Sequence, residues 1–198
     1  MTDDSGLAFV RADGTPRFEL PGWLELISDT SDPVRLAGLI VEAIVPGFAD
    51  SAGIFVLDEI LTGGPVSQPV GTQIVVRRFA TILTESGRPI SGAVLPPAQV
   101  ISFADDSPYA RCVHQRTPVI FTHPGNQTMQ RVTRGARSAL GQYASFLAAP
   151  LTARDQALGF LVLGRSADQP AFGAGDAETA ADLAVRVGTG IASSLGLL

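Results

Sequence analysis

Four segments of the chain place apolar residues at helical spacing. They cover residues 33–45, 108–115, about 126–142, and 175 to near the C-terminus. The first of them starts at Asp32-Pro33, a favoured N-cap residue followed by proline at the first helical position, and ends at Pro46-Gly47. The last carries an apolar stripe on one face. The spacing therefore predicts four helices.

Five other segments are short, apolar and rich in β-branched or aromatic residues, as is typical of strands. They are 52–61, 73–83, 119–121, 145–151 and 157–163. The last two are joined by a polar stretch and predict a hairpin with its turn over residues 152–156. The stretch 89–106 contains Pro96-Pro97 and predicts an ordered loop or an irregular strand.

Strands and helices interleave in an order that favours an antiparallel α+β sandwich over a doubly wound parallel sheet. At 198 residues, the chain is expected to form one main domain. Residues 1–31 mix Gly, Pro, Asp and Ser, and only PGWLELI at 21–27 is suited to packing. We expect a mobile leader with a short docking segment over 1–31, followed by the domain at 32–198.

The composition excludes several classes of protein. With 45% hydrophobic and 17% charged residues, the chain buries enough apolar surface to fold. It has neither an apolar run of about 18 residues nor a basic N-terminal segment, so we expect a soluble, cytoplasmic protein with no membrane span. The single cysteine, Cys112, excludes an internal disulfide, a zinc ribbon and a catalytic dithiol.

Charge is distributed unevenly along the chain. All 14 basic residues are arginine, and the net charge is −5, which argues against nucleic-acid binding, DNA included. The segment 107–154, however, contains six arginines and no acidic residue. Arg131, Arg134 and Arg137 are three apart and share one face of their predicted helix. These arginines are either solvated surface groups or part of a site for a small anion.

The C-terminal third resembles a GAF domain, and with the upstream elements the resemblance covers about residues 32–196. The order and spacing of short sequence blocks carry it. These blocks are Arg137-Ser138-Ala139-Leu140, Ala149-Pro150-Leu151, Leu158-Gly159-Phe160-Leu161-Val162-Leu163, Phe172-Gly173, Asp176, and a helix with Leu183-Ala184 and Ile191-Ala192. The sequence is most similar to GAF domains of actinobacterial sensor proteins, which precede phosphatase, kinase or RNA-binding output domains.

The resemblance implies a GAF/PAS-like six-stranded antiparallel sheet. Helices from both ends of the domain would pack on one face, and a lid of loops and short helices over about 89–142 would cover a ligand pocket on the other. The candidate ligand-binding residues are the aromatics, histidines and arginines near this pocket: Phe103, Tyr109, His114, Phe121, His123, Arg131, Arg134, Arg137 and Tyr143. Core packing is the alternative for each aromatic residue.

Several chemistries known in GAF domains do not fit this sequence. The Asn-Lys…Phe-Asp-Glu motif of cyclic-nucleotide sites requires a lysine, and this chain has none. Bilin attachment requires a cysteine in the helix at 126–142, whereas Cys112 lies one helix earlier. A single cysteine also cannot complete the disulfide relay of the free methionine sulfoxide reductases. No nucleophile elbow, metalloprotease motif or phosphate loop is present, so we expect no enzymatic activity.

Two histidine-based sites remain as alternatives. His114 or His123 can serve as an axial haem ligand, as in some GAF sensors. A metal site of Cys112, His114 and His123 with Asp105 and Asp106 matches no established spacing, and Cys112 and His114 point about 200° apart on a helix.

Small residues at Gly188, Gly190, Ala192 and Ser194 allow close approach of another helix. In GAF domains the terminal helices often pair, so we expect a homodimer; the alternative is contact with the chain's own first helix. The first hypothesis for the function is a non-catalytic sensor that binds a small, anionic molecule, and the second is a ligand-free dimerisation or protein-interaction module. A third alternative is an enzyme that uses the pocket for a reaction without a recognisable motif. The sequence leaves open the identity of the ligand and of the output partner.

Overall fold

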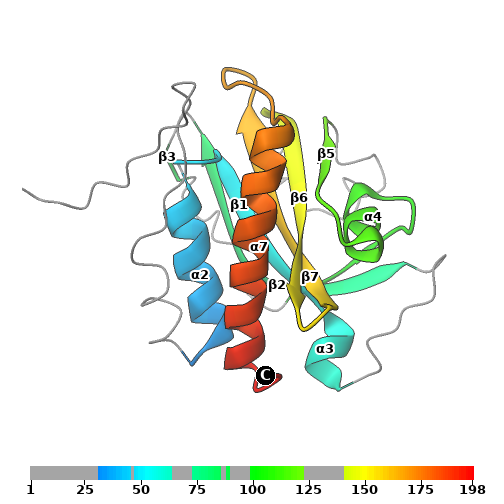
Figure 1. Cartoon of the computed structure of the whole chain (residues 1–198). Helices are drawn as coiled ribbons and strands as arrows, with labels where there is room; N and C mark the ends of the chain where they lie inside the picture. The colour runs from blue at the N-terminus through cyan, green and yellow to red at the C-terminus, as the bar shows by residue number, and fades with distance from the viewer. Residues whose placement is uncertain (1–30, 46, 64–72, 86–87, 90–98, 123–140) are drawn as a thin grey trace, which may run out of the picture.

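The computed structural model describes residues 31–45, 47–63, 73–85, 88–89, 99–122 and 141–198 (Figure 1). Within these ranges, no helix is long and apolar enough to cross a membrane. The predicted leader at 1–31 and the predicted helix at 126–142 lie almost wholly outside them. The elements in chain order are α2 (Pro33–Ile44), β1 (Ser51–Leu57), α3 (Asp58–Thr62), β2 (Ile74–Glu85), β3 (Arg88–Pro89), β4 (Val100–Phe103), α4 (Pro108–Gln115), β5 (Val119–Phe121), β6 (Tyr143–Ala153), β7 (Gln156–Ser166) and α7 (Ala174–Ser194).

The strands form one antiparallel sheet in the order β3-β2-β1-β7-β6-β5, with β4 also paired to β2. Six of them have three residues or more, and β3 contributes only two. The α+β class and the six-stranded antiparallel sheet expected from the sequence are therefore confirmed. Strands β1 and β7, far apart in the sequence, are paired with each other at the centre of the sheet.

The prediction of a strand through 52–61 is wrong at its C-terminal end. The strand stops at Leu57, and Asp58–Thr62 form the short helix α3, which ends at Gly63 in the left-handed conformation (φ 69°). The Asp58 carboxylate accepts hydrogen bonds from Nε and Nη2 of Arg77, at 3.0 and 2.6 Å. This ion pair to the neighbouring strand and the acidic first turn favour the start of a helix at Asp58. The apolar pattern of residues 52–61 does not reveal either feature.

The hairpin of β6 and β7 is confirmed, with a tighter turn than predicted. Both strands extend to Ala153 and Gln156, so only Arg154 and Asp155 remain in the turn. Their φ values are +46° and +63°, as a two-residue turn that follows the right-handed strand twist requires. The polar residues at 152–156 thus include strand ends as well as the turn.

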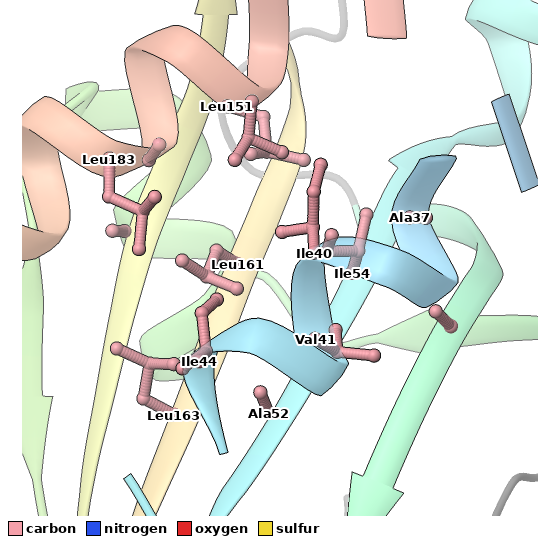
Figure 2. Close-up of a cluster of buried hydrophobic side chains, with 14 of the residues drawn as sticks. Ala37, Ile40, Val41, Ile44, Ala52, Ile54, Leu151, Leu161, Leu163 and Leu183 are labelled. Atoms are coloured by element: carbon pink, nitrogen blue, oxygen red, sulfur yellow. The ribbon is translucent and has the colours of Figure 1, made fainter. Parts of the chain in front are cut away.

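The helices α2 and α7 lie side by side on one face of the sheet (Figure 1). The core there is built from alternate residues of β1, β6 and β7 against the apolar stripes of both helices (Figure 2). Leu36, Ile40 and Ile44 of α2 and Leu183 and Val187 of α7 are fully or almost fully buried in it. The expected packing of both terminal helices on one face is confirmed.

Most of the small residues of α7 are buried in the chain's own fold, and Gly188 contacts the sheet. Gly188, Gly190 and Ala192 are buried, and a Cβ on Gly188 would lie 2.5 Å from the carbonyl oxygen of Thr152 in β6. The sequence interpretation that these residues admit a second helix is therefore wrong for Gly188, because the sheet occupies that space. The expected homodimer stays a prediction.

Candidate functional site

The opposite face of the sheet carries α4, and we call it the α4 face. Strand register decides which side chains reach it, because cross-strand partners point to the same side. Phe55 of β1 pairs with Phe160 of β7 and with Arg78 of β2. An irregularity in the β1–β2 register leaves Phe79 without a cross-strand partner and turns it into the helix-side core. Arg78 consequently lies on the α4 face.

An aromatic cluster fills the α4 face beneath α4. It consists of Phe55, Phe103, Tyr109, Phe121 and Phe160. The Tyr109 ring centroid lies 4.6 Å from that of Phe103, 5.3 Å from that of Phe121 and 5.1 Å from that of Phe160. Burial raises the pKa of the Tyr109 phenol, which keeps it neutral.

Three aromatic residues predicted from the sequence, Phe103, Tyr109 and Phe121, are thus brought together. They contact one another, as the core-packing alternative requires. Phe55 and Phe160, which complete the cluster, were not among the sequence candidates. The alternation of side chains along a strand indicates that Phe55 and Phe160 point to one face of the sheet, but it does not indicate which face that is.

Tyr143 forms a second cluster on this face with Leu83 and Phe146. Its hydroxyl donates a hydrogen bond to the Thr84 carbonyl oxygen at 2.8 Å and accepts one from the Thr84 amide at 3.0 Å. The ring passes over Gly164, where an added Cβ would lie 3.4 Å from Tyr143 Cγ. Tyr143 therefore ties β6 to β2 across the two central strands. Burial, the largest effect, raises the pKa of its phenol, and the hydrogen bonds to Thr84 oppose this.

Between these two clusters runs a strip of small and polar residues on neighbouring strands. We call Gly53, Arg78 and Thr81 the β1–β2 strip. Thr81 lies opposite Gly53 in the register. A Cβ on Gly53 would lie 2.9 Å from Phe55 Cε2 and 3.2 Å from Thr81 Oγ1, so neighbouring side chains converge over the glycine. The strip is the polar part of the α4 face on β1 and β2.

Arg78 gives this strip a buried positive charge. Its relative exposure is 5%, and its Nη2 donates a hydrogen bond to Gln99 Oε1 at 3.0 Å. Desolvation lowers the pKa of the guanidinium from its usual value. Sequence reasoning missed Arg78, although two adjacent arginines in an apolar strand, Arg77-Arg78, require one of them to face the buried side.

His114 lies at the end of α4, and its Nε2 is 3.0 Å from Asp105 Oδ1. This contact connects α4 to the loop before it and engages Nε2 of the His114 ring. Cys112 is fully buried, and burial raises the pKa of its thiol, so it is a poor nucleophile or metal ligand at neutral pH. In the described part of the chain, no three His, Cys, Asp or Glu side chains gather as metal ligands do.

The remaining candidates, His123, Arg131, Arg134 and Arg137, lie outside the described residues. Their expected place in the lid stays a prediction. Of the predicted lid at 89–142, the structure describes β4, α4, β5 and short flanking segments. In these segments α4 packs on β5, β6 and β7, at the end of the sheet far from β3.

A family model for the GAF domain matches residues 30–192. This match covers most of the chain, and the fold agrees with it. The chain therefore belongs to the GAF domain family, a family of sensory and regulatory domains. No curated protein sequence matches the chain.

Solved structures of other proteins share the fold. The GAF domain of a phosphoenolpyruvate-protein phosphotransferase from Coxiella burnetii superposes with a TM-score of 0.58 at 17% identity, over 89% of this chain and 93% of that one. A methyl-accepting chemotaxis protein segment gives 0.56 at 14% identity, over 88% and 98%. A free methionine-R-sulfoxide reductase from Neisseria meningitidis, solved with its substrate, gives 0.54 at 13% identity, over 90% and 89%. At these identities the likeness concerns the fold alone.

Proposed function

We propose that this GAF domain is a non-catalytic sensor that binds a small, anionic molecule on the α4 face and signals through α2 and α7. The observation that carries the proposal is the β1–β2 strip, where small and polar side chains interrupt an otherwise apolar, aromatic sheet face. A face used only for packing gains most from continuous apolar contact, because buried polar groups cost free energy unless they are well bonded. The acid-free, arginine-rich segment 107–154 supports an anion as the ligand.

The absence of catalysis is part of the same proposal. Among the described residues, His114 is held by Asp105 and Cys112 is buried with a raised pKa. Tyr109 and Tyr143 are neutral phenols within aromatic clusters. These groups suit binding and packing better than proton transfer or nucleophilic attack.

Signalling requires a mechanical connection from the α4 face to the helices, and β7 offers one. Phe160 and Val162 lie on the α4 side of this strand, and Arg165 follows at its end. Two nitrogens of the Arg165 guanidinium donate to the two carboxylate oxygens of Asp176 in the first turn of α7, at 3.1 and 3.2 Å. Nη2 also donates to the Phe48 carbonyl oxygen, just after α2. A shift of β7 on binding would thus reach both helices.

The alternative function is a ligand-free dimerisation or protein-interaction module. The packing of Phe55, Phe103 and Phe160 beneath Tyr109 favours it, since that part of the α4 face is already filled by side chains. In either case the partner would be an output domain, such as a phosphatase, kinase or RNA-binding domain, or a second copy of the chain.

Native mass spectrometry and an absorption spectrum of the freshly purified full chain test the proposal. A sensor is expected to retain a small molecule of defined mass, and a visible band would reveal haem. The native mass spectrum also reports the oligomeric state. A protein that carries no ligand, and whose melting temperature no member of a metabolite panel raises, would support the interaction module instead.

A pair of variants tests the anionic character of the ligand. Arg134→Ala with Arg137→Ala removes two arginines of the predicted lid, and we expect weaker binding of the retained or identified ligand. Arg111→Ala with Arg116→Ala removes two exposed arginines of the same acid-free segment and serves as the control. If the lid double variant binds the ligand as tightly as the control double variant, the lid arginines have no role in binding.

A further inference from the structure

The outward face of the two terminal helices carries a charge pattern that is complementary to its own copy. Helices α2 and α7 lie side by side, and residues on their sides turned away from the sheet are exposed (Figure 1). We propose that this face binds a second copy of the chain, with the two α2 helices antiparallel and Arg35 of each copy against the partner's Glu42. The inference goes beyond the proposed function, because it holds with or without a ligand on the α4 face.

The outward stripe of α2 is symmetric about its own midpoint. Four residues fall within an arc of about 100° opposite the buried side of the helix: Arg35, Gly38, Leu39 and Glu42. The two charged residues are exposed, and the two between them are partly buried. A two-fold axis between Gly38 and Leu39 therefore places Arg35 across from the partner's Glu42 and repeats this pair on the other side of the axis. In a parallel pair, by contrast, each charge would meet a like charge.

The order of these two charges is unfavourable in an isolated helix. The N-terminus of a helix favours acidic side chains, and its C-terminus favours basic ones. In α2 this order is reversed, because Arg35 lies in the first turn and Glu42 in the last. No ion pair within the described residues engages either side chain. An antiparallel partner supplies the opposite charge at each end, and the negative end of its own α2 dipole lies near Arg35.

The exposed charges of α7 have the same polarity. The start of α7 lies beside the end of α2, as the hydrogen bonds of Arg165 to both regions show. The exposed Glu178 therefore lies toward the acidic end of α2, and the exposed Arg186 lies toward its basic end, with Asp182 between them. Two copies related by the proposed axis thus face each other with opposite potentials at both ends of the face.

The size of the face sets the strength of association that we expect. Helix α7 has 21 residues, so with α2 beside it the face measures about 30 by 20 Å, or roughly 600 Å² per copy. Leu39 and Val185, the latter 49% exposed, supply its apolar part. Two copies would bury about 1,200 Å², which is the lower end of the range for specific interfaces. We therefore expect a reversible dimer with a micromolar dissociation constant.

Charge reversal, followed by sedimentation velocity of the full chain, tests the interface. Arg35→Glu and Glu42→Arg each bring like charges together twice, once on each side of the axis. An equimolar mixture of the two variants restores opposite charges, and so does a chain that carries both substitutions. Each substitution agrees with the helix dipole, so α2 is expected to fold at least as stably as in the wild type. The controls, Arg111→Glu and Asp106→Arg, make the same changes in net charge at exposed positions on α4 and before it.

We expect dimerisation to weaken at least about tenfold in each single reversal and less than about twofold in each control. The mixture and the doubly substituted chain are expected to dimerise within about threefold of the wild type. Association of the wild type is expected to weaken as the salt concentration rises from about 50 to 500 mM, because the ion pairs lie at the surface.

Disulfide trapping reports the orientation of the two copies. Single-cysteine substitutions Arg35→Cys and Glu42→Cys, mixed and oxidised, are expected to form a disulfide with each other. Neither is expected to form one with its own copy, since like positions lie about 10 Å apart along the helix axis in the antiparallel pair. The native Cys112 is buried and does not compete.

Three results would overturn the inference. A full chain that stays monomeric up to about 200 μM would leave the face to another occupant, such as residues 21–27 or an unrelated protein. Single reversals that dimerise as tightly as the wild type would place the interface elsewhere. Disulfides between like positions would show a parallel pair. None of these results bears on the retention of a small molecule in native mass spectra, which tests the proposed function separately.

Discussion

Helix α7 approaches β6 closely at Gly188. A Cβ there would lie 2.5 Å from the carbonyl oxygen and 2.7 Å from the amide nitrogen of Thr152. Both are backbone atoms of β6, one residue from the end of the tight hairpin, so they do not swing away as a side chain does. Gly188→Ala must therefore move α7 or β6 apart by roughly 1 Å to restore ordinary van der Waals contact.

The magnitude follows from two opposing effects. Overpacking a well-packed site costs about 1–3 kcal/mol, and replacing glycine by alanine inside a helix returns about 0.5–1 kcal/mol. We expect a net loss of up to about 2.5 kcal/mol in the free energy of unfolding. For a domain of this size that corresponds to a melting temperature lower by up to about 10 °C.

The matched control is Gly38→Ala, the same substitution in the middle of α2. No heavy atom lies within 4 Å of a Cβ built on Gly38, so only the helix-propensity gain of about 0.5–1 kcal/mol applies. Urea unfolding followed by far-UV circular dichroism measures both variants. The reasoning is refuted if Gly188→Ala is as stable as Gly38→Ala, because the two glycines would then have equivalent surroundings.

Two other predictions concern local features of the fold. Asp32 Oδ1 accepts hydrogen bonds from the amides of Val34 and Arg35 at 2.9 and 3.4 Å, so Asp32→Ala should cost about 1 kcal/mol in urea unfolding and Asp32→Asn much less; equal losses would exclude a capping role. Burial raises the pKa of the Cys112 thiol in the folded state. Above the unfolded thiol pKa of about 8.5, only the unfolded state therefore releases this proton. The free energy of unfolding should consequently fall by up to about 1.4 kcal/mol per pH unit. Cys112→Ala should lessen this decline between about pH 8.5 and 10, and an unchanged slope would contradict the assignment.

Much of the fold could be predicted from periodicity and local signals. The helices at Pro33–Ile44 and Pro108–Gln115 and the hairpin of β6 and β7 were located within a few residues, because N-caps, prolines and alternation are encoded locally. The end of β1 was misjudged, since the ion pair between Asp58 and Arg77 joins residues 19 apart.

The candidate site was predicted less completely. Phe103, Tyr109 and Phe121 lie together in mutual ring contact, and their role in ligand binding stays a prediction. Arg78 is not indicated by the charge distribution along the chain, because it lies outside the acid-free segment 107–154. Whether Arg131, Arg134 and Arg137 reach the same site stays a prediction.

The sequence by itself determined the GAF class, the α+β order of elements and the apolar stripes of α2 and α7, because these depend on spacing along the chain. Only the tertiary structure decided which face each strand residue occupies. A register irregularity between β1 and β2 turns Phe79 to the helices and Arg78 to the α4 face. Side chains of a strand alternate between the two faces of the sheet, so an irregularity of one residue exchanges the faces for the residues beyond it. The position of this irregularity depends on how β2 pairs with β1, a strand about 25 residues away in the sequence.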